Sequence, residues 1–174
     1  MEYDFVLKFR LPADDADADD LVERLGAAGC DDALVGSGQP GRIALNFTRE
    51  AASAKRAVIS ALRDVKKAIP GGQLIEVSPD LVGLTDIAEL IAVSRQNMRK
   101  LMLTHTDSFP APVHEGSSTL WHLAPVLQWL ENRGAYQFER ALLDVAHIAM
   151  QINLAKEANG LETPVQREVR MLVA

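Results

Sequence analysis

The chain has 174 residues, of which 48% are hydrophobic and 24% are charged, a balance typical of a folded globular protein. No apolar run approaches the roughly 20 residues that a membrane span needs, so we expect no membrane partner. The net charge of −6 argues against a protein that binds nucleic acid through overall basicity. Cys30 is the only cysteine, which excludes an internal disulfide and favours a reducing, cytoplasmic setting.

The N-terminal segment begins with a strand pattern and continues into a helix pattern. Tyr3–Leu11 alternates apolar and polar residues, which predicts a strand with one buried and one open side. Aspartates crowd the stretch 14–20 ahead of a helix that ends at Gly29, as expected for acids near a helix N-terminus and a glycine beyond its last turn. We interpret the acids as a cap and a solvated face, because the spacing of a calcium loop is missing.

Two short strands, a second helix and a last strand follow. Residues 32–36 and 42–48 read as strands joined by a glycine-rich turn, and an apolar stripe between 51 and 69 predicts the helix. Residues 73–77 read as the last strand. The order strand, helix, strand, strand, helix, strand predicts an α+β, ferredoxin-like domain over 1–80. One face of its sheet is expected to be open, and such a face can serve for dimerisation or for binding a partner protein or a small ligand.

The segment after Pro79–Gly83, which reads as a hinge, predicts two short helices joined by a tight turn. Thr85 and Ser94 are the expected caps of the first and the second helix. The predicted buried residues of the pair are Ile87, Ala88, Ile91, Met98, Leu101 and Met102. So short a turn makes the helices cross steeply and presents the start of the second helix outward, as insertion into a DNA groove requires.

The outward side of the second helix, 94–103, carries side chains of the types that can hydrogen-bond to DNA bases. Arg95 and Arg99 can each donate two parallel hydrogen bonds to guanine, and Gln96 or Asn97 can make the equivalent pair of hydrogen bonds with adenine. Lys100 lies on the same outward side, and Ser94 and the helix N-terminus suit phosphate oxygens. The alternative is an ordinary polar helix surface. We favour a DNA-binding helix, because the cap, the tight turn and the residues able to pair with bases all occur in this one segment.

Beyond the helix pair, the Phe-Pro-x-Pro run at 109–113 precedes a turn at 115–118, a strand with Trp121, and a helix that ends on Trp129-Leu130. With the helix pair, this succession resembles the winged helix-turn-helix of the MerR-like and excisionase-like (AlpA-type) family over about residues 83–131. The resemblance implies a strand at 109–113 that forms the wing hairpin with the strand of Trp121. The resemblance implies DNA recognition by the second helix, with the wing on the DNA backbone or minor groove.

The residues expected to bind DNA are Thr85, Ser94, Arg95, Gln96, Asn97, Arg99, Lys100, His114, Ser117 and Ser118. The sequence departs from the family at two positions. Ala92 stands where the family usually has glycine, and a positive φ there would strain it. Glu115 makes the wing acidic, and the wing has no lysine or arginine, which weakens the expected phosphate contact.

The C-terminal segment 134–174 predicts two helices beyond the expected DNA-binding domain, 81–133. A seam able to pair with another helix consists of Phe138, Leu142, Val145, Ala149 and Ile152. The seam can pack on the chain's own domains or form a homodimer, and the sequence leaves both open.

We therefore expect a homodimeric transcriptional regulator that binds double-stranded DNA at an inverted repeat. One alternative is an antitoxin-like or accessory module whose first domain binds a partner protein or small ligand. Another is an excisionase-like protein that bends DNA. The sequence shows no nucleophile–base pair and no metal-ligand spacing among its histidines, so we expect no enzyme activity, no cofactor and no metal.

Overall fold

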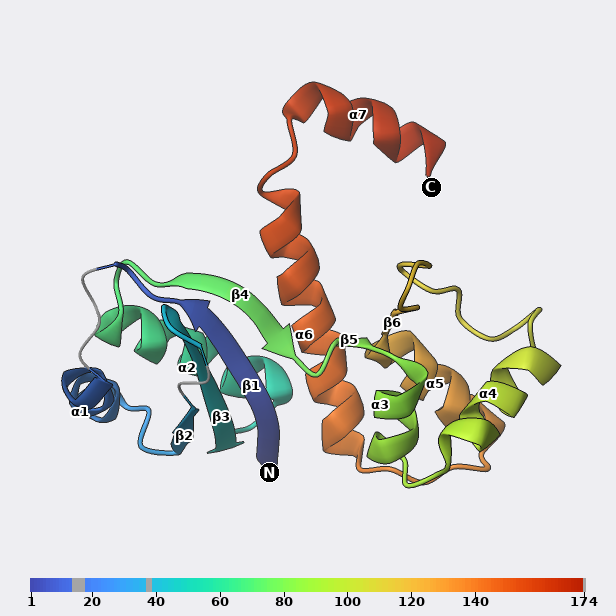
Figure 1. The fold of residues 1–174 in the computed structure, drawn as a ribbon, viewed down its shortest axis with the longest axis horizontal. Coiled ribbons are helices and arrows are strands. Elements are labelled where there is room, and N and C mark those ends of the chain that lie inside the picture. The colour runs from blue at the N-terminus through green and yellow to red at the C-terminus, as the bar shows by residue number, and fades with distance from the viewer. Residues whose placement is uncertain (14–17, 37–38, 174) are drawn as a thin grey trace.

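The computed structural model describes residues 1–13, 18–36 and 39–173. The described elements form a mixed α+β structure with a four-stranded and a two-stranded sheet (Figure 1). In chain order they are β1 (Glu2–Arg10), α1 (Ala18–Ala28), β2 (Ala33–Gly36), β3 (Arg42–Glu50), α2 (Ala54–Ala68), β4 (Gln73–Ser78), β5 (Leu81–Val82), α3 (Leu84–Leu90), α4 (Arg95–Thr104), β6 (Trp121–His122), α5 (Leu123–Arg133), α6 (Arg140–Ala158) and α7 (Thr163–Leu172). Asp14, Asp15, Asp17 and the turn residues 37–38 lie outside the described residues.

The four-stranded sheet is antiparallel, with the strand order β2-β3-β1-β4. The predicted alternation along β1 is confirmed, because Tyr3, Phe5, Leu7 and Phe9 are all buried. The opposite face carries mainly polar, internally paired side chains, although Val6, Ala44 and the exposed Leu34 also lie on it. Thr48 donates a hydrogen bond to Asp4 at 2.6 Å, and Lys8 forms an ion pair with Glu76 at 2.5 Å.

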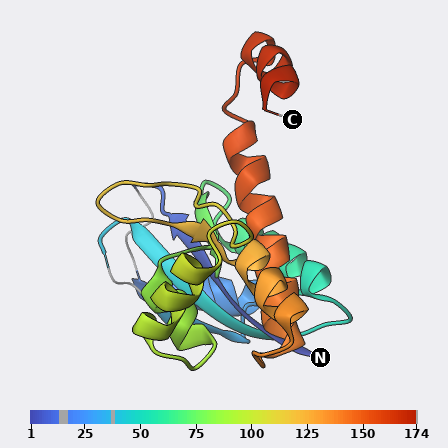
Figure 2. The same ribbon diagram turned by 90° about the vertical axis from the view of Figure 1, so that its right-hand side faces the viewer.

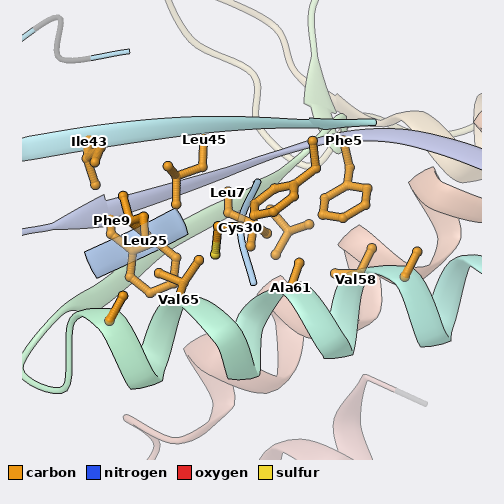
Figure 3. Packing of buried hydrophobic residues seen from close by; sticks show 14 of the residues in the cluster. Phe5, Leu7, Phe9, Leu25, Cys30, Ile43, Leu45, Val58, Ala61 and Val65 are labelled. Carbon is orange, nitrogen blue, oxygen red and sulfur yellow. The ribbon is translucent and has the colours of Figure 1, made fainter. Parts of the chain in front are cut away.

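The buried face of the sheet forms the first hydrophobic core with α1 and α2 (Figure 3). Figure 3 shows α2 running beneath the strands, with Val58, Ala61 and Val65 turned toward them. Alanine at 61 is fully buried and lets the helix approach the strands closely. Each fully buried large apolar side chain contributes roughly 1.5–3 kcal/mol, so this core dominates the stability of the first part of the chain.

Helix α6 belongs to two cores at once. Val145 and Ala149 are buried in the core beneath the sheet, whereas Leu143 and Ala146 are buried in a second core with α3, α4 and α5. Figure 1 shows α6 passing between the four-stranded sheet and these helices. The predicted seam of this segment is therefore occupied by contacts within the same chain.

The outer edge of β4 is covered by polar side chains of α6. The Asn153 side chain accepts a hydrogen bond from the Val77 backbone N–H at 2.9 Å and donates one to the Val77 carbonyl at 2.8 Å. The Lys156 ammonium donates to the carbonyl of Ile75. These bonds satisfy backbone groups that an open sheet edge would leave unpaired.

Asp80 joins three segments that are far apart in the sequence. Its buried carboxylate lies 2.6 Å from His122 Nδ1 and accepts from the Asn153 amide at 2.7 Å. Its carbonyl accepts from the Leu123 N–H at 2.7 Å. The expected hinge at Pro79–Gly83 was therefore wrong, because this segment contains β5, which pairs with β6 and is tied down by the Asp80 contacts.

Arg49 is a buried charge at the end of β3. Its guanidinium donates to both carboxylate oxygens of Asp32, to Asp64, to Ser60 and to the carbonyl of Gly29, at distances of 2.6–3.0 Å. The hydrogen bonds that Arg49 donates to Asp32 raise the pKa of its guanidinium, and burial opposes this effect. Every N–H of the side chain has an acceptor, which is what a buried arginine requires.

Cys30 is a free thiol that is buried in the hydrophobic core beneath the four-stranded sheet. Burial raises the pKa of Cys30 to about 11, with a smaller contribution from the nearby carboxylate of Asp64. The thiol is therefore protonated at neutral pH, and it acts as a small apolar side chain.

Replacing Arg49 by alanine should destabilise the fold by about 3 kcal/mol, because Asp32 and Asp64 lose their shared cation. We place the effect at the low end of the usual range because the Asp32 side chain is 29% exposed and water can reach it. The free energy of unfolding in urea measures the change. Arg42→Ala, at the exposed start of the same strand, is the control and should change stability by less than about 0.5 kcal/mol. Equal unfolding midpoints for the two variants would contradict the role given to Arg49.

Candidate nucleic-acid interface

Helices α3 and α4 form the predicted pair around a small, tightly packed contact. Ile87 and Ala88 of α3, the C-cap residue Ile91 and Met98 of α4 are buried, as the sequence predicts. Leu101 and Met102 were also predicted to be buried but are only half-buried, and Met102 lines the open groove described below. The Val93 N–H donates to the carbonyl of Ala88 at 2.9 Å and closes the turn between the helices. The pair thus holds the start of α4 at the surface.

The turn between the helices passes through a left-handed residue. Ala92 has φ = 55°, so the condition under which the sequence implies strain is met at a position where glycine would be free of it. A left-handed conformation costs an L-residue about 1–2 kcal/mol, and the packing of α3 on α4 keeps the residue in it.

The two helix starts are capped differently. Ser94 is the N-cap of α4, and its hydroxyl accepts from the Asn97 N–H at 3.1 Å, as predicted. The prediction of Thr85 as a cap was wrong, because α3 begins at Leu84 with Gly83 as its N-cap. Glycine has no side chain to offer, and the Asp86 carboxylate instead accepts from the Gly83 N–H at 2.7 Å. Thr85 is an exposed residue of the first helical turn.

The outward side of α4 is exposed to solvent. Arg95, Gln96, Asn97, Arg99 and Lys100 are all exposed. Within the described part of the chain, the three cations of this helix form no ion pair, unlike the arginine of β3 described above. Their charge and their hydrogen-bond donors are available to a ligand.

An open groove of about 680 Å³ lies between α4, the start of α3 and the wing loop, residues 106–120. Five of the predicted DNA-binding residues line it: Thr85, Arg95, Arg99, Ser117 and Ser118. The others are Ser94, Gln96, Asn97, Lys100 and His114, which are exposed outside the groove lining. The sequence therefore identified residues from three separate segments that meet at one surface.

The wing loop contains less strand than predicted. Residues 109–113 form no strand, and a single bridge joins His114 to Leu120, while the strand β6 pairs with β5 instead. The physical reason is visible in the sequence, because Pro110 and Pro112 have no backbone N–H to donate to a strand ladder.

Aromatic contacts hold the base of the wing loop. The Trp121 indole donates to the carbonyl of Pro110 at 3.1 Å, and Phe109 packs edge-on against Trp121 and Trp129, with ring centroids 6.2 and 5.1 Å away. Edge-to-face packing of this kind stabilises by about 0.5–1.5 kcal/mol per pair beyond the buried area. The Phe-Pro run thus anchors the loop to α5 without a ladder.

The tip of the wing loop is compact because His114 folds over Gly116. A Cβ atom at Gly116 would lie 2.6 Å from Nε2 of His114, so only glycine fits this position without a shift of the ring. This contact and the bridge to Leu120 restrict the residues between them.

Comparisons with protein families, with curated proteins and with solved structures find no match to this chain. Among the described residues, no three of His, Cys, Asp and Glu are gathered so that they could hold a metal ion. No helix in the described ranges is long and apolar enough to cross a membrane.

Replacing Ala92 by glycine should stabilise the protein by about 0.5–1 kcal/mol, because removal of the strain outweighs the greater flexibility of glycine in the unfolded chain. Urea denaturation measures the effect. Ala155→Gly, at an exposed position of α6, is the matched control and should destabilise by about 1 kcal/mol. A loss of stability in both variants would show that Ala92 is not strained.

Proposed function

We propose that the chain is a sequence-specific regulator of transcription that binds double-stranded DNA through α4. The observation that carries the proposal is the pair Arg95 and Arg99, both exposed, both free of ion pairs within the described chain, and both lining the groove opposite the wing loop. In this interpretation, residues 81–133 act as a winged helix-turn-helix, and residues 1–80 form a ferredoxin-like unit that supports it.

The side chains of α4 match the chemistry of DNA. An arginine guanidinium donates two parallel hydrogen bonds to guanine O6 and N7, and Gln96 or Asn97 can make the equivalent pair with adenine. The capped N-terminus of α4 and Lys100 suit phosphate oxygens. These contacts combine base reading with positioning on the backbone.

The wing loop supplies weaker contacts. Ser117 and Ser118 line the groove and can donate hydroxyl hydrogen bonds to phosphate, and His114 is exposed at the loop tip. Because the loop has no lysine or arginine, the cations of α4 supply the electrostatic attraction. Binding should therefore weaken as salt rises, because counterions compete with these cations for the phosphates.

Changing Arg95 or Arg99 to alanine should weaken binding to a specific DNA site by about 1–3 kcal/mol, since each loses a forked base contact. Fluorescence anisotropy on a DNA duplex enriched from a random pool measures the affinity. The control is Arg42→Ala, which removes an exposed arginine from β3 and should leave the affinity within about twofold. Equal affinities of wild type and both α4 variants would refute the assignment of α4.

We propose further that the chain acts as a homodimer, paired through α7. Helix α7 stands away from the rest of the chain in two perpendicular views (Figures 1 and 2). A stripe of exposed apolar side chains runs along it: Leu161, Val165, Val169 and Leu172. Two antiparallel copies of such a stripe are self-complementary, as a twofold interface requires. The seam of α6 is already occupied within the chain, and on the open sheet face Leu34 is the one exposed large apolar side chain among the described residues, beside paired polar groups.

Sedimentation equilibrium tests the dimer. The wild type should be dimeric at micromolar concentration, and Val165→Asp should raise the dimer dissociation constant at least about tenfold, because the interface would have to bury an unpaired charge. Arg167→Asp, on the opposite side of α7, should leave the dimer intact. A monomeric wild type, or equal effects of the two variants, would exclude pairing through α7.

A further inference from the structure

Glu115 is the single acidic side chain among the described residues that line the groove. The other ionisable groups of the lining are Arg95 and Arg99. Glu115 is exposed, and within the described chain it pairs with neither arginine nor with any other cation. A free carboxylate thus shares a surface with two free guanidinium groups.

The fold restrains Glu115 at this place. Its neighbour His114 is bridged to Leu120 and packs over Gly116, and the base of the wing loop is anchored by Trp121. Glu115, Arg95 and Arg99 line the same groove of about 680 Å³. The phosphates of DNA that enters this groove therefore experience the charge of Glu115, since charges within a Debye length of about 10 Å are incompletely screened at 0.1 M salt.

The hydrogen-bonding capacity of Glu115 limits what it can bind on DNA. An ionised carboxylate only accepts hydrogen bonds, and phosphate oxygens also only accept them. The donors that DNA presents in its grooves are the amino groups of cytosine and adenine in the major groove and of guanine in the minor groove. A direct contact of Glu115 with DNA must therefore be to a base.

We propose that Glu115 is a specificity-determining residue of the DNA site. Its negative charge weakens the binding of any DNA that is held only through phosphate contacts. When the correct sequence is present, its carboxylate also accepts a hydrogen bond from a base amino group. This inference rests on the proposed DNA-binding function. Specificity of this kind combines an attractive contact to the right partner with a repulsive one to the wrong partner.

The test compares Glu115→Gln with Asp107→Asn. Both variants remove one negative charge from an exposed residue of the wing loop, but Asp107 does not line the groove. Affinities are measured by fluorescence anisotropy for an enriched duplex and for a random-sequence duplex at several salt concentrations. We expect Glu115→Gln to bind the random duplex about three- to tenfold tighter, with a slope of log affinity against log salt steeper by about one unit. Its preference for the enriched duplex should fall by at least the same factor, and Asp107→Asn should match the wild type.

An unchanged preference in Glu115→Gln, or the same change in both variants, would overturn the role of Glu115 and leave the proposed function intact. A wild-type protein that binds neither duplex would overturn the proposed function and this inference with it.

Discussion

The packing of α6 between two hydrophobic cores is the constraint that fixes how the parts of this chain sit relative to one another. One side of the helix completes the core beneath the four-stranded sheet, and another completes the core of the helix pair. Polar contacts reinforce this arrangement, since Asn153 bonds both the edge of β4 and the buried carboxylate of Asp80, which also holds His122. The groove beside α4 is therefore presented by a supported scaffold, and precise presentation is what base recognition requires.

Most of the correct predictions came from local patterns in the sequence. The alternation in β1, the apolar stripe of α2 and the buried side of α3 depend on the repeat of a strand or a helix, which can be read within a dozen residues. The cap at Ser94 and the positive φ at Ala92 are likewise local, because each depends on the turn between two adjacent helices. For the same reason, the residues of α4 that face outward could be named before the structure was known.

Contacts between segments that are distant in the sequence were not predicted or were predicted wrongly. No local sequence pattern around Asp80 predicts its contacts with His122 and Asn153, which lie 42 and 73 residues away. The partners of Arg49 come from two other segments, so its burial had no local signal. Two errors were avoidable: the prolines of the wing loop argue against a strand at 109–113, and Asp86 three residues after Gly83 is the spacing of a capping contact.

The central claim is that α4 and the wing loop form a DNA-reading surface on an acidic protein. Selection of binding sites from a pool of random DNA duplexes, with the full-length chain as the bait, tests it most directly. The account predicts an enriched sequence built from two inverted half-sites about one helical turn, or roughly 34 Å, apart. A pool that after repeated rounds shows no sequence enriched over the starting mixture would contradict it.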